Sequence, residues 1–263
     1  MIRLENVSLS YTSRDKSQIE AIRDVSLTVA EGEFISLIGP SGCGKTTVLE
    51  IIAGLKSPDK GRVFRNEKQI DRSFGWAGYM TQNDTLLPWR TVAKNVAIGL
   101  ELRGYSRQEI AKRVTELIAT VGLQDFADNY PAEISGGMKK RLGLIRILAY
   151  EPEVLLLDEP FAALDAQTRE FLQEDLLRLW RNYRKTVIFV THDLTEAILL
   201  SDRIVLFSNR PAIVRKEYII DLPRPRPNLD IQFSEQFIRL HQQIRSDLMH
   251  EVSRFQSLIA EVV

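Results

Sequence analysis

The residues with the clearest chemical potential lie together in residues 39–47, which read GPSGCGKTT. The stretch from Gly39 to Thr46 fits the pattern G-x-x-x-x-G-K-[ST], and it stands between an apolar run at 34–38 and a helical pattern that begins near Val48. Glycines allow successive backbone N–H groups to turn toward one anion, and the start of the following helix adds partial positive charge. A lysine and a hydroxyl beside them suit phosphate oxygens and Mg²⁺. We therefore expect a nucleoside triphosphate to bind here, rather than an ordinary glycine-rich turn.

Two adjacent carboxylates follow a second apolar run, in residues 154–159 (VLLLDE). Four consecutive apolar residues are typical of a strand that is buried on both faces. At the exit of such a strand, Asp158 would hold Mg²⁺ and Glu159 would orient or deprotonate an attacking water. The alternative is a solvated turn, which a phosphate-binding loop in the same chain makes the weaker interpretation.

A third candidate is the start of a helix at Ser135, Gly136 and Gly137. Serine caps a helix, and glycines leave the first N–H groups accessible to an anion. By itself this pattern is no more than a capped helix.

The elements that must position these residues follow from hydrophobic periodicity. Residues 2–29 alternate apolar and polar side chains, which predicts a half-buried antiparallel sheet. The runs at 34–38, 154–157 and 186–190 each precede a helical pattern, which favours a parallel sheet with flanking helices. Residues 91–150 indicate an inserted helical lobe, and the prolines of 222–227 (LPRPRP) indicate a linker.

Composition excludes several classes of protein. The 263 residues carry 35 basic and 35 acidic side chains, so bulk charge gives no support for nucleic-acid binding. Cys43 is the only cysteine, which rules out an internal disulfide and fits a reducing compartment. We expect neither a signal peptide nor a membrane span, because the N-terminus lacks an apolar core and no 18-residue apolar run occurs.

Taken together and in this order, the motifs resemble those of the ATP-binding-cassette (ABC) ATPases over about residues 1–225. The resemblance implies an α/β fold: a P-loop NTPase core with an N-terminal antiparallel β subdomain and an inserted α-helical subdomain at about 91–150. It leaves 226–263 as a C-terminal helical tail, whose residues Phe237, Leu240, Ile244 and Leu248 share one helix face.

The same resemblance implies a role for each site residue. Glu159, His192, Lys45 and Gln82 would serve catalysis, and Thr46, Gln82 and Asp158 would hold Mg²⁺. Asp165 matches the D-loop together with Ala163 and Leu164, and Ser135-Gly136-Gly137 matches the signature that closes on the γ-phosphate of a second subunit. The residues expected to contact ATP are Tyr11, by stacking on adenine, and Gly39, Ser41, Gly42, Cys43, Gly44, Lys45, Thr46, Thr47, Ser135, Gly136, Gly137 and Asp165. Cys43 is expected to contribute no chemistry of its own.

Met138 departs from the broad family signature, which has glutamine there, and methionine cannot make that hydrogen bond. Methionine at this position resembles the ATP-binding subunits of nitrate, sulfonate and taurine importers, as do residues 86–92, 210–211 and 221–224. Tyr79-Met80-Thr81 before Gln82 is a second departure, where phenylalanine is more usual.

The resemblance therefore implies an ATPase subunit that powers uptake of a small anionic solute. Its partners would be transmembrane permease subunits, a second copy of the chain and, indirectly, a solute-binding protein, with no nucleic acid. It would sit peripherally on the cytoplasmic face of the inner membrane. The apolar residues after Gln82, including Leu86, Leu87 and Trp89, either pack on the helical lobe or receive a short helix of the permease.

Three other functions remain as alternatives. A cassette that acts on DNA or ribosomes would be expected to have a second cassette, a long coiled coil or a basic extension. An exporter ATPase is disfavoured by residues 86–92, through resemblance alone. A nucleotide-binding scaffold without catalysis is disfavoured by the presence of both Glu159 and His192.

Overall fold

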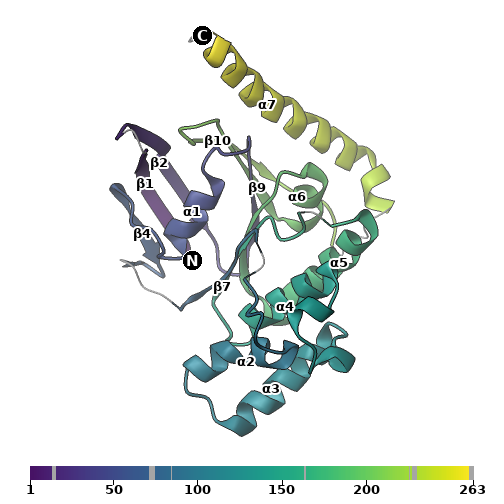
Figure 1. The fold of residues 1–263 in the computed structure, drawn as a ribbon. Helices are drawn as coiled ribbons and strands as arrows, with labels where there is room; N and C mark the ends of the chain where they lie inside the picture. The colour runs from purple at the N-terminus through teal and green to yellow at the C-terminus, as the bar shows by residue number, and fades with distance from the viewer. Residues whose placement is uncertain are drawn as a thin grey trace. The chain divides into compact units, whose positions relative to one another are not determined.

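The computed structural model describes residues 1–13, 16–70, 75–83, 85–162, 164–224, 226 and 230–260, with side chains described up to Ser253 in the last helix. The chain forms two compact units (Figure 1). The first unit comprises Met1–Phe74 and Thr186–Val263, and the second comprises Gly75–Lys185. Ala163, Pro225 and Pro227, which belong to motifs discussed above, lie outside the described residues, as does Asp84.

An antiparallel sheet opens the first unit, as the alternation of its residues predicts. Its strands are β1 (Ile2–Thr12), β2 (Gln18–Val29), β4 (Lys60–Arg65) and β5 (Lys68–Gln69), in the order β2-β1-β4-β5. Figure 1 shows β2, β1 and β4 side by side. Ile2 pairs with Val29 and Leu4 with Leu27, so apolar residues meet across the sheet. All four of these side chains are buried, because period-two spacing places them on one face.

A parallel arrangement of strands forms the core of the first unit. β3 (Phe34–Ile38) lies between β8 (Thr186–Val190) and β9 (Arg203–Phe207) and is parallel to both. β10 (Val214–Ile219) pairs antiparallel with β9. Every residue of β3 and β8 is buried, including the polar Ser36 and Thr186, as the largely apolar composition of both stretches predicts. The helices α1 (Lys45–Ile52) and α6 (Leu194–Leu200) follow β3 and β8. The glycine-rich loop and the turn that carries His192 therefore each lie between a strand and a helix.

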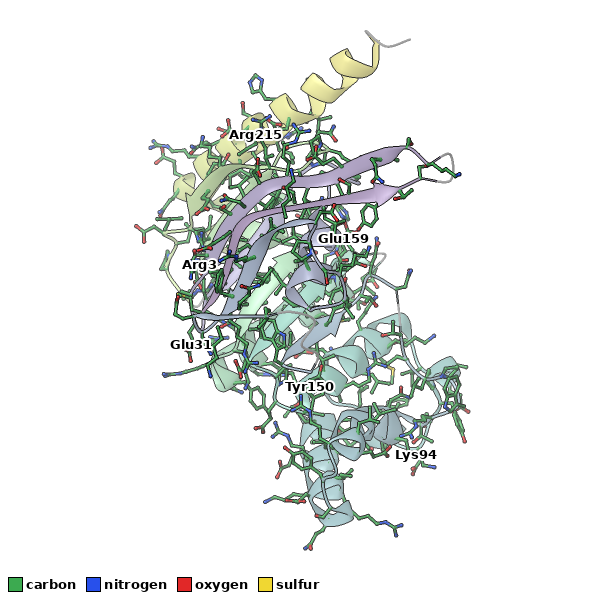
Figure 2. All side chains as sticks on the ribbon, turned by 90° about the vertical axis from the view of Figure 1, so that its left-hand side faces the viewer. Arg3, Glu31, Lys94, Tyr150, Glu159 and Arg215 are labelled. Atoms are coloured by element: carbon green, nitrogen blue, oxygen red, sulfur yellow. The ribbon has the colours of Figure 1, made fainter. Side chains whose placement is uncertain are left out.

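The first unit ends in η3 (Asp230–Phe233) and the long helix α7 (Glu235–Ala260), yellow in Figure 1. Phe237 and Ile244 of α7 join a buried apolar cluster with residues of α6. Farther along α7, Glu251 pairs with Arg215 of β10 at 3.3 Å (Figure 2). The apolar face that the sequence shows on this helix therefore packs on the unit's own body.

In its described residues the second unit combines two strands with four α-helices and two short 3₁₀ helices. β6 (Ala77–Met80) and β7 (Val154–Asp158) are parallel. The helical elements are α2 (Val92–Leu102), α3 (Arg107–Thr120), η1 (Gln124–Phe126), η2 (Pro131–Glu133), α4 (Gly136–Leu148) and α5 (Ala166–Tyr183). The side chains of Lys94 on α2 and Tyr150 after α4 mark this unit in Figure 2. None of the helices in the described part of the chain has the length and apolar character needed to cross a bilayer.

Candidate functional site

The glycine-rich loop between β3 and α1 has the backbone that the sequence motif predicts. Gly39, Gly42 and Gly44 all have positive φ, at 155°, 72° and 127°. A Cβ at Gly44 would lie 2.8 Å from the Ala21 carbonyl oxygen, and one at Gly39 would lie 2.9 Å from that of Phe207. These two glycines are needed for close packing, whereas Gly42 has open space around it and is needed for its left-handed backbone.

Lys45 lies inside the loop rather than in solvent. It is only 6% exposed, and its ammonium donates to the carbonyl oxygens of Gly39 at 2.8 Å and Pro40 at 2.9 Å. No side chain caps the start of α1 at Gly44, so the helix presents its first N–H groups uncapped by a side chain. A buried cation, uncapped N–H groups and the exposed Thr46 hydroxyl together form a donor set that fits a polyphosphate.

Cys43 is fully buried beneath this loop, with its Sγ 3.7 Å from the Lys45 ammonium nitrogen. Burial raises the pKa of the Cys43 thiol above its ordinary value. The thiol therefore stays protonated at neutral pH, in keeping with the expectation that it contributes no chemistry.

Tyr11, at the end of β1, is tied to α1 by its hydroxyl. The hydroxyl lies 2.9 Å from Thr47 Oγ1 and accepts a hydrogen bond from the Lys56 ammonium at 2.7 Å. Lys56 also pairs with Glu50 of α1 at 2.8 Å. The aromatic side chain is thus oriented by a polar network on the phosphate-loop helix. The sequence did not reveal Lys56 or Glu50, because nothing in their spacing links them to a tyrosine 45 or 39 residues away.

His192 follows β8 on a turn that is braced from both sides. Thr191 is buried, and its hydroxyl donates to Glu196 Oε2 at 2.6 Å while it accepts from the Asp193 N–H at 3.0 Å. Asp193 caps α6 by accepting from the N–H groups of Thr195 and Glu196. The His192 side chain itself is exposed, so the turn presents it outward on a rigid base.

The carboxylates of the second unit lie at the end of β7. Asp158 is 3% exposed, and Glu159 has a left-handed backbone with φ of 45°. Glu159 is labelled in Figure 2. Left-handed backbone costs a residue with a side chain on the order of 1–2 kcal/mol. Such strain at a predicted functional residue is commonly part of a site's design. Gln82, after β6, donates from Nε2 to Glu159 Oε2 at 3.0 Å, so two of the predicted site residues meet directly.

The signature residues start α4 in the predicted manner. Ser135 Oγ accepts from the Met138 N–H at 3.3 Å, and Gly136 is exposed with open space around it. A Cβ at Gly137 would lie 2.6 Å from Thr168 Cγ2, so this glycine lets α4 approach the start of α5.

Asp165 caps α5, a local role that its resemblance to the D-loop did not indicate. Its carboxylate accepts from the Thr168 N–H at 2.9 Å, and hydrogen bonds to Thr168 lower the pKa of this carboxyl. Each unit thus holds part of the predicted set. The first unit holds the phosphate loop with Tyr11 and His192, and the second holds Gln82, Asp158, Glu159, Asp165 and the signature.

Asn95 of α2 is a residue whose role sequence reasoning missed. Its side chain is fully buried and bonds to the backbone of the turn after Gln82, at Leu87, Arg90 and Thr91. The signal was available, because an asparagine on the apolar face of a helix must find buried partners. Trp89, on the same turn, remains 71% exposed, so the structure does not pack it on the helices.

Comparison with known proteins places these features in one family. The family model described as ABC transporter matches residues 22–162. The aliphatic sulfonates import ATP-binding protein of Bacillus licheniformis is 45% identical, over 84% of this chain and 88% of that protein. The taurine import ATP-binding protein of Pseudomonas aeruginosa (strain UCBPP-PA14) is 43% identical, over 84% and 83%.

A solved structure agrees in fold as well. It is the dimeric, post-hydrolysis state of an ATP-binding cassette bound to ADP and Pi, with a TM-score of 0.75 at 32% identity, and it covers 85% of this chain and 100% of that one. The motifs, the fold and these matches together show that the chain belongs to the ABC transporter family.

Proposed function

We propose that the chain is the ATP-hydrolysing subunit of an importer for a small anionic solute of the nitrate, sulfonate or taurine type. The family carries ATP binding and hydrolysis, and the two relatives named above are, by name, import ATP-binding proteins for sulfonates and taurine. The observation that carries the catalytic part is the contact between Gln82 and Glu159 at the end of β7.

ATP would bind first through its phosphates. The buried Lys45 ammonium would exchange the carbonyl oxygens of its own loop for phosphate oxygens, assisted by the backbone N–H groups of Gly39 and of residues 41–47. The Thr47 hydroxyl, now bonded to Tyr11, would face the same phosphates, and the Tyr11 ring would stack on adenine.

Mg²⁺ fits the residues proposed to hold it: the Thr46 hydroxyl, the Gln82 amide oxygen and the Asp158 carboxylate. All three are oxygen donors, which this hard cation prefers. When bound, the ion would neutralise charge on the transferred phosphate.

Glu159 would orient or deprotonate the attacking water, with its carboxylate held by the Gln82 amide. His192 would contact the γ-phosphate from its braced turn after β8.

A second copy of the chain would complete the site. Its helix start at Ser135-Gly136-Gly137, of which Ser135 and Gly136 are exposed, would close on the γ-phosphate, and its Asp165 would lie beside the nucleotide. The transmembrane permease would bind the second unit, which exposes Trp89. The same unit has a hollow of about 460 Å³ that is lined by apolar and charged residues of α2 and α3. A solute-binding protein would act through the permease, and the chain would lie peripherally on the cytoplasmic face of the inner membrane.

The domain division expected from the sequence is also part of this proposal. Residues 1–225 would form the ATPase domain, with a helical subdomain at about 91–150, and 226–263 would form a C-terminal tail.

The test is the change Glu159→Gln, and the matched control is Glu174→Gln, at an exposed position of α5. We expect Glu159→Gln to keep ATP affinity within about twofold and to lower hydrolysis by roughly 10²–10⁴-fold, the scale for a lost general base. The variant should also accumulate as an ATP-bound dimer in size-exclusion chromatography. Turnover near that of the wild type, with the control equally active, would remove Glu159 from the role.

A further inference from the structure

Helix α4 holds the segment after β6 at two points. The Lys140 ammonium donates to the backbone carbonyl oxygen of Gln82 at 3.2 Å. The Arg146 guanidinium donates to both the carbonyl oxygen and the hydroxyl of Thr85, each at 2.6 Å. Both cations lie on the helix whose first turn is the signature, so one rigid element contacts the signature serine and the Gln82 segment together.

Lys140 is an unusual residue for this position in a helix interior. The Lys140 side chain is only 9% exposed, whereas that of the adjacent Lys139 is half-buried and therefore still partly in contact with solvent. An ammonium that leaves water must recover its hydration energy from fixed polar partners. The carbonyl oxygen of Gln82 is one such partner, so the position of that peptide is coupled to the burial of a charge.

The other end of Gln82 contacts the reacting group. Its amide donates to Glu159 at 3.0 Å, while its own backbone is held by Lys140. The path from α4 to the carboxylate therefore passes through a single residue and two hydrogen bonds. A shift of the Gln82 peptide would move the amide away from Glu159.

We propose that Lys140 is a positioning residue that fixes the Gln82 backbone so that its side chain orients Glu159, with Arg146 holding the same segment at Thr85. The proposal rests on the role of Glu159 proposed above. It makes the helix that begins with the signature a direct determinant of the geometry of the carboxylate within the same subunit.

The experiment is a double-mutant cycle with Lys140→Met and Gln82→Ala, and Lys139→Met is the matched control for charge loss on α4. Methionine keeps the length and helix propensity of lysine but removes the donor. We expect Lys140→Met to lower kcat by about 10- to 100-fold, the scale for a misplaced catalytic group, with ATP affinity within about twofold. Lys139→Met should leave both unchanged.

The Gln82→Ala background separates positioning from stability. That change keeps the carbonyl oxygen, so Lys140 still bonds to it and Lys140→Met should still lower stability to urea as much as in the wild type. Its effect on kcat should shrink to about twofold or less, because the amide through which it acts is gone. An equal loss of kcat in both backgrounds, or none in either, would overturn the proposal.

Two further measurements keep the result interpretable. If Lys140→Met does not fold, Thr85→Val is used instead, because it changes an exposed residue at the second contact of α4 with this segment. The same double-mutant cycle with Gln82→Ala then applies. A drop in kcat that disappears in the Gln82→Ala background supports the positioning role of these α4 contacts, and a drop that is additive with that of Gln82→Ala contradicts it. Glu159→Gln is measured alongside: if it is fully active, the proposed role of Glu159 fails, whereas an inactive Glu159→Gln with a fully active Lys140→Met overturns only the present inference.

Discussion

The buried side chain of Asn95 offers the sharpest test of how the turn after Gln82 is built. Its Nδ2 donates to the carbonyl oxygens of Leu87 at 3.1 Å, Arg90 at 2.9 Å and Thr91 at 3.1 Å, and its Oδ1 accepts from the Leu87 N–H at 2.8 Å. The change Asn95→Asp keeps the shape and replaces the donor with an oxygen that faces three carbonyl oxygens. Asn95→Ala removes donor and acceptor together and introduces no charge.

The magnitudes follow from these contacts. Two amide hydrogens and one acceptor are lost in Asn95→Ala, and at about 1 kcal/mol for each hydrogen bond the free energy of unfolding should fall by about 2–4 kcal/mol. Asn95→Asp adds the burial of a carboxylate. Burial should raise the pKa of the introduced carboxyl above its ordinary value, and burying it in its charged form should cost about 3 kcal/mol in addition. We therefore expect Asn95→Asp to be the less stable variant at neutral pH.

The assay is urea unfolding followed by circular dichroism at pH 7.5 and pH 5.0, with Asn83→Asp as the control for the same charge change at an exposed position. The introduced carboxyl at position 95 has a folded-state pKa above its unfolded value. Its penalty is therefore complete above the folded-state pKa and declines as the pH falls toward the unfolded value, so the gap between Asn95→Asp and Asn95→Ala should narrow at pH 5.0. An Asn95→Asp variant within about 0.5 kcal/mol of the wild type, a difference expected at ordinary surface sites, would refute this account of the turn.

The remaining predictions concern ATP, the permease and the last helix. Lys45→Ala should weaken ATP binding and abolish hydrolysis, and unchanged binding of a fluorescent nucleotide would contradict the phosphate-loop assignment. Tyr11→Phe keeps the ring and should retain more ATP affinity than Tyr11→Ala, measured by calorimetry; equal losses would mean that the hydroxyl, and not stacking, is what matters. Trp89→Ser should leave the melting temperature within about 2 °C, because the side chain is 71% exposed, and should reduce copurification with the permease; normal copurification would exclude Trp89 from that interface. Hydrogen bonds from Lys216 and Tyr218 lower the pKa of Asp247, so its contribution to stability is present above the unfolded value and is lost as acidification passes the folded-state pKa. Asp247→Asn should therefore flatten the loss of stability below about pH 4 in acid titrations, and an unchanged acid profile would count against the contact.

Much of the fold could be predicted because the relevant signals are local. The alternation of residues 2–29 indicates which face of a sheet is buried, and the largely apolar stretches at 34–38 and 186–190 indicate strands that are covered on both faces. The glycine-rich loop at 39–47 could also be predicted, because nine consecutive residues contain both the glycines that determine its backbone conformation and the lysine that gives it charge. The loop between β3 and α1 and its buried lysine agree with that prediction.

The contacts that hold the site residues in place were harder to predict, because they join residues far apart in the chain. Gln82 and Glu159 are separated by 77 residues, and Lys140 and Gln82 by 58. Periodicity reports the environment of a residue and says nothing of its partner. A lysine on a helix is ordinarily interpreted as part of a solvated face, so Lys139 and Lys140 gave the same signal.

Lys139 and Lys140 differ in a property that the sequence alone does not predict, namely which side of α4 is buried. Each follows the signature on α4, yet only Lys140 is turned to the segment that carries Gln82. Helical geometry alone fixes an angle of about 100° between neighbouring residues, so one lysine must face a different side from the other. Which side is buried depends on the segment that packs there, and that segment is set by the strand β6, more than 50 residues earlier. The charge at position 140 therefore acquires its role from tertiary structure, and the cycle with Gln82→Ala tests that acquired role directly.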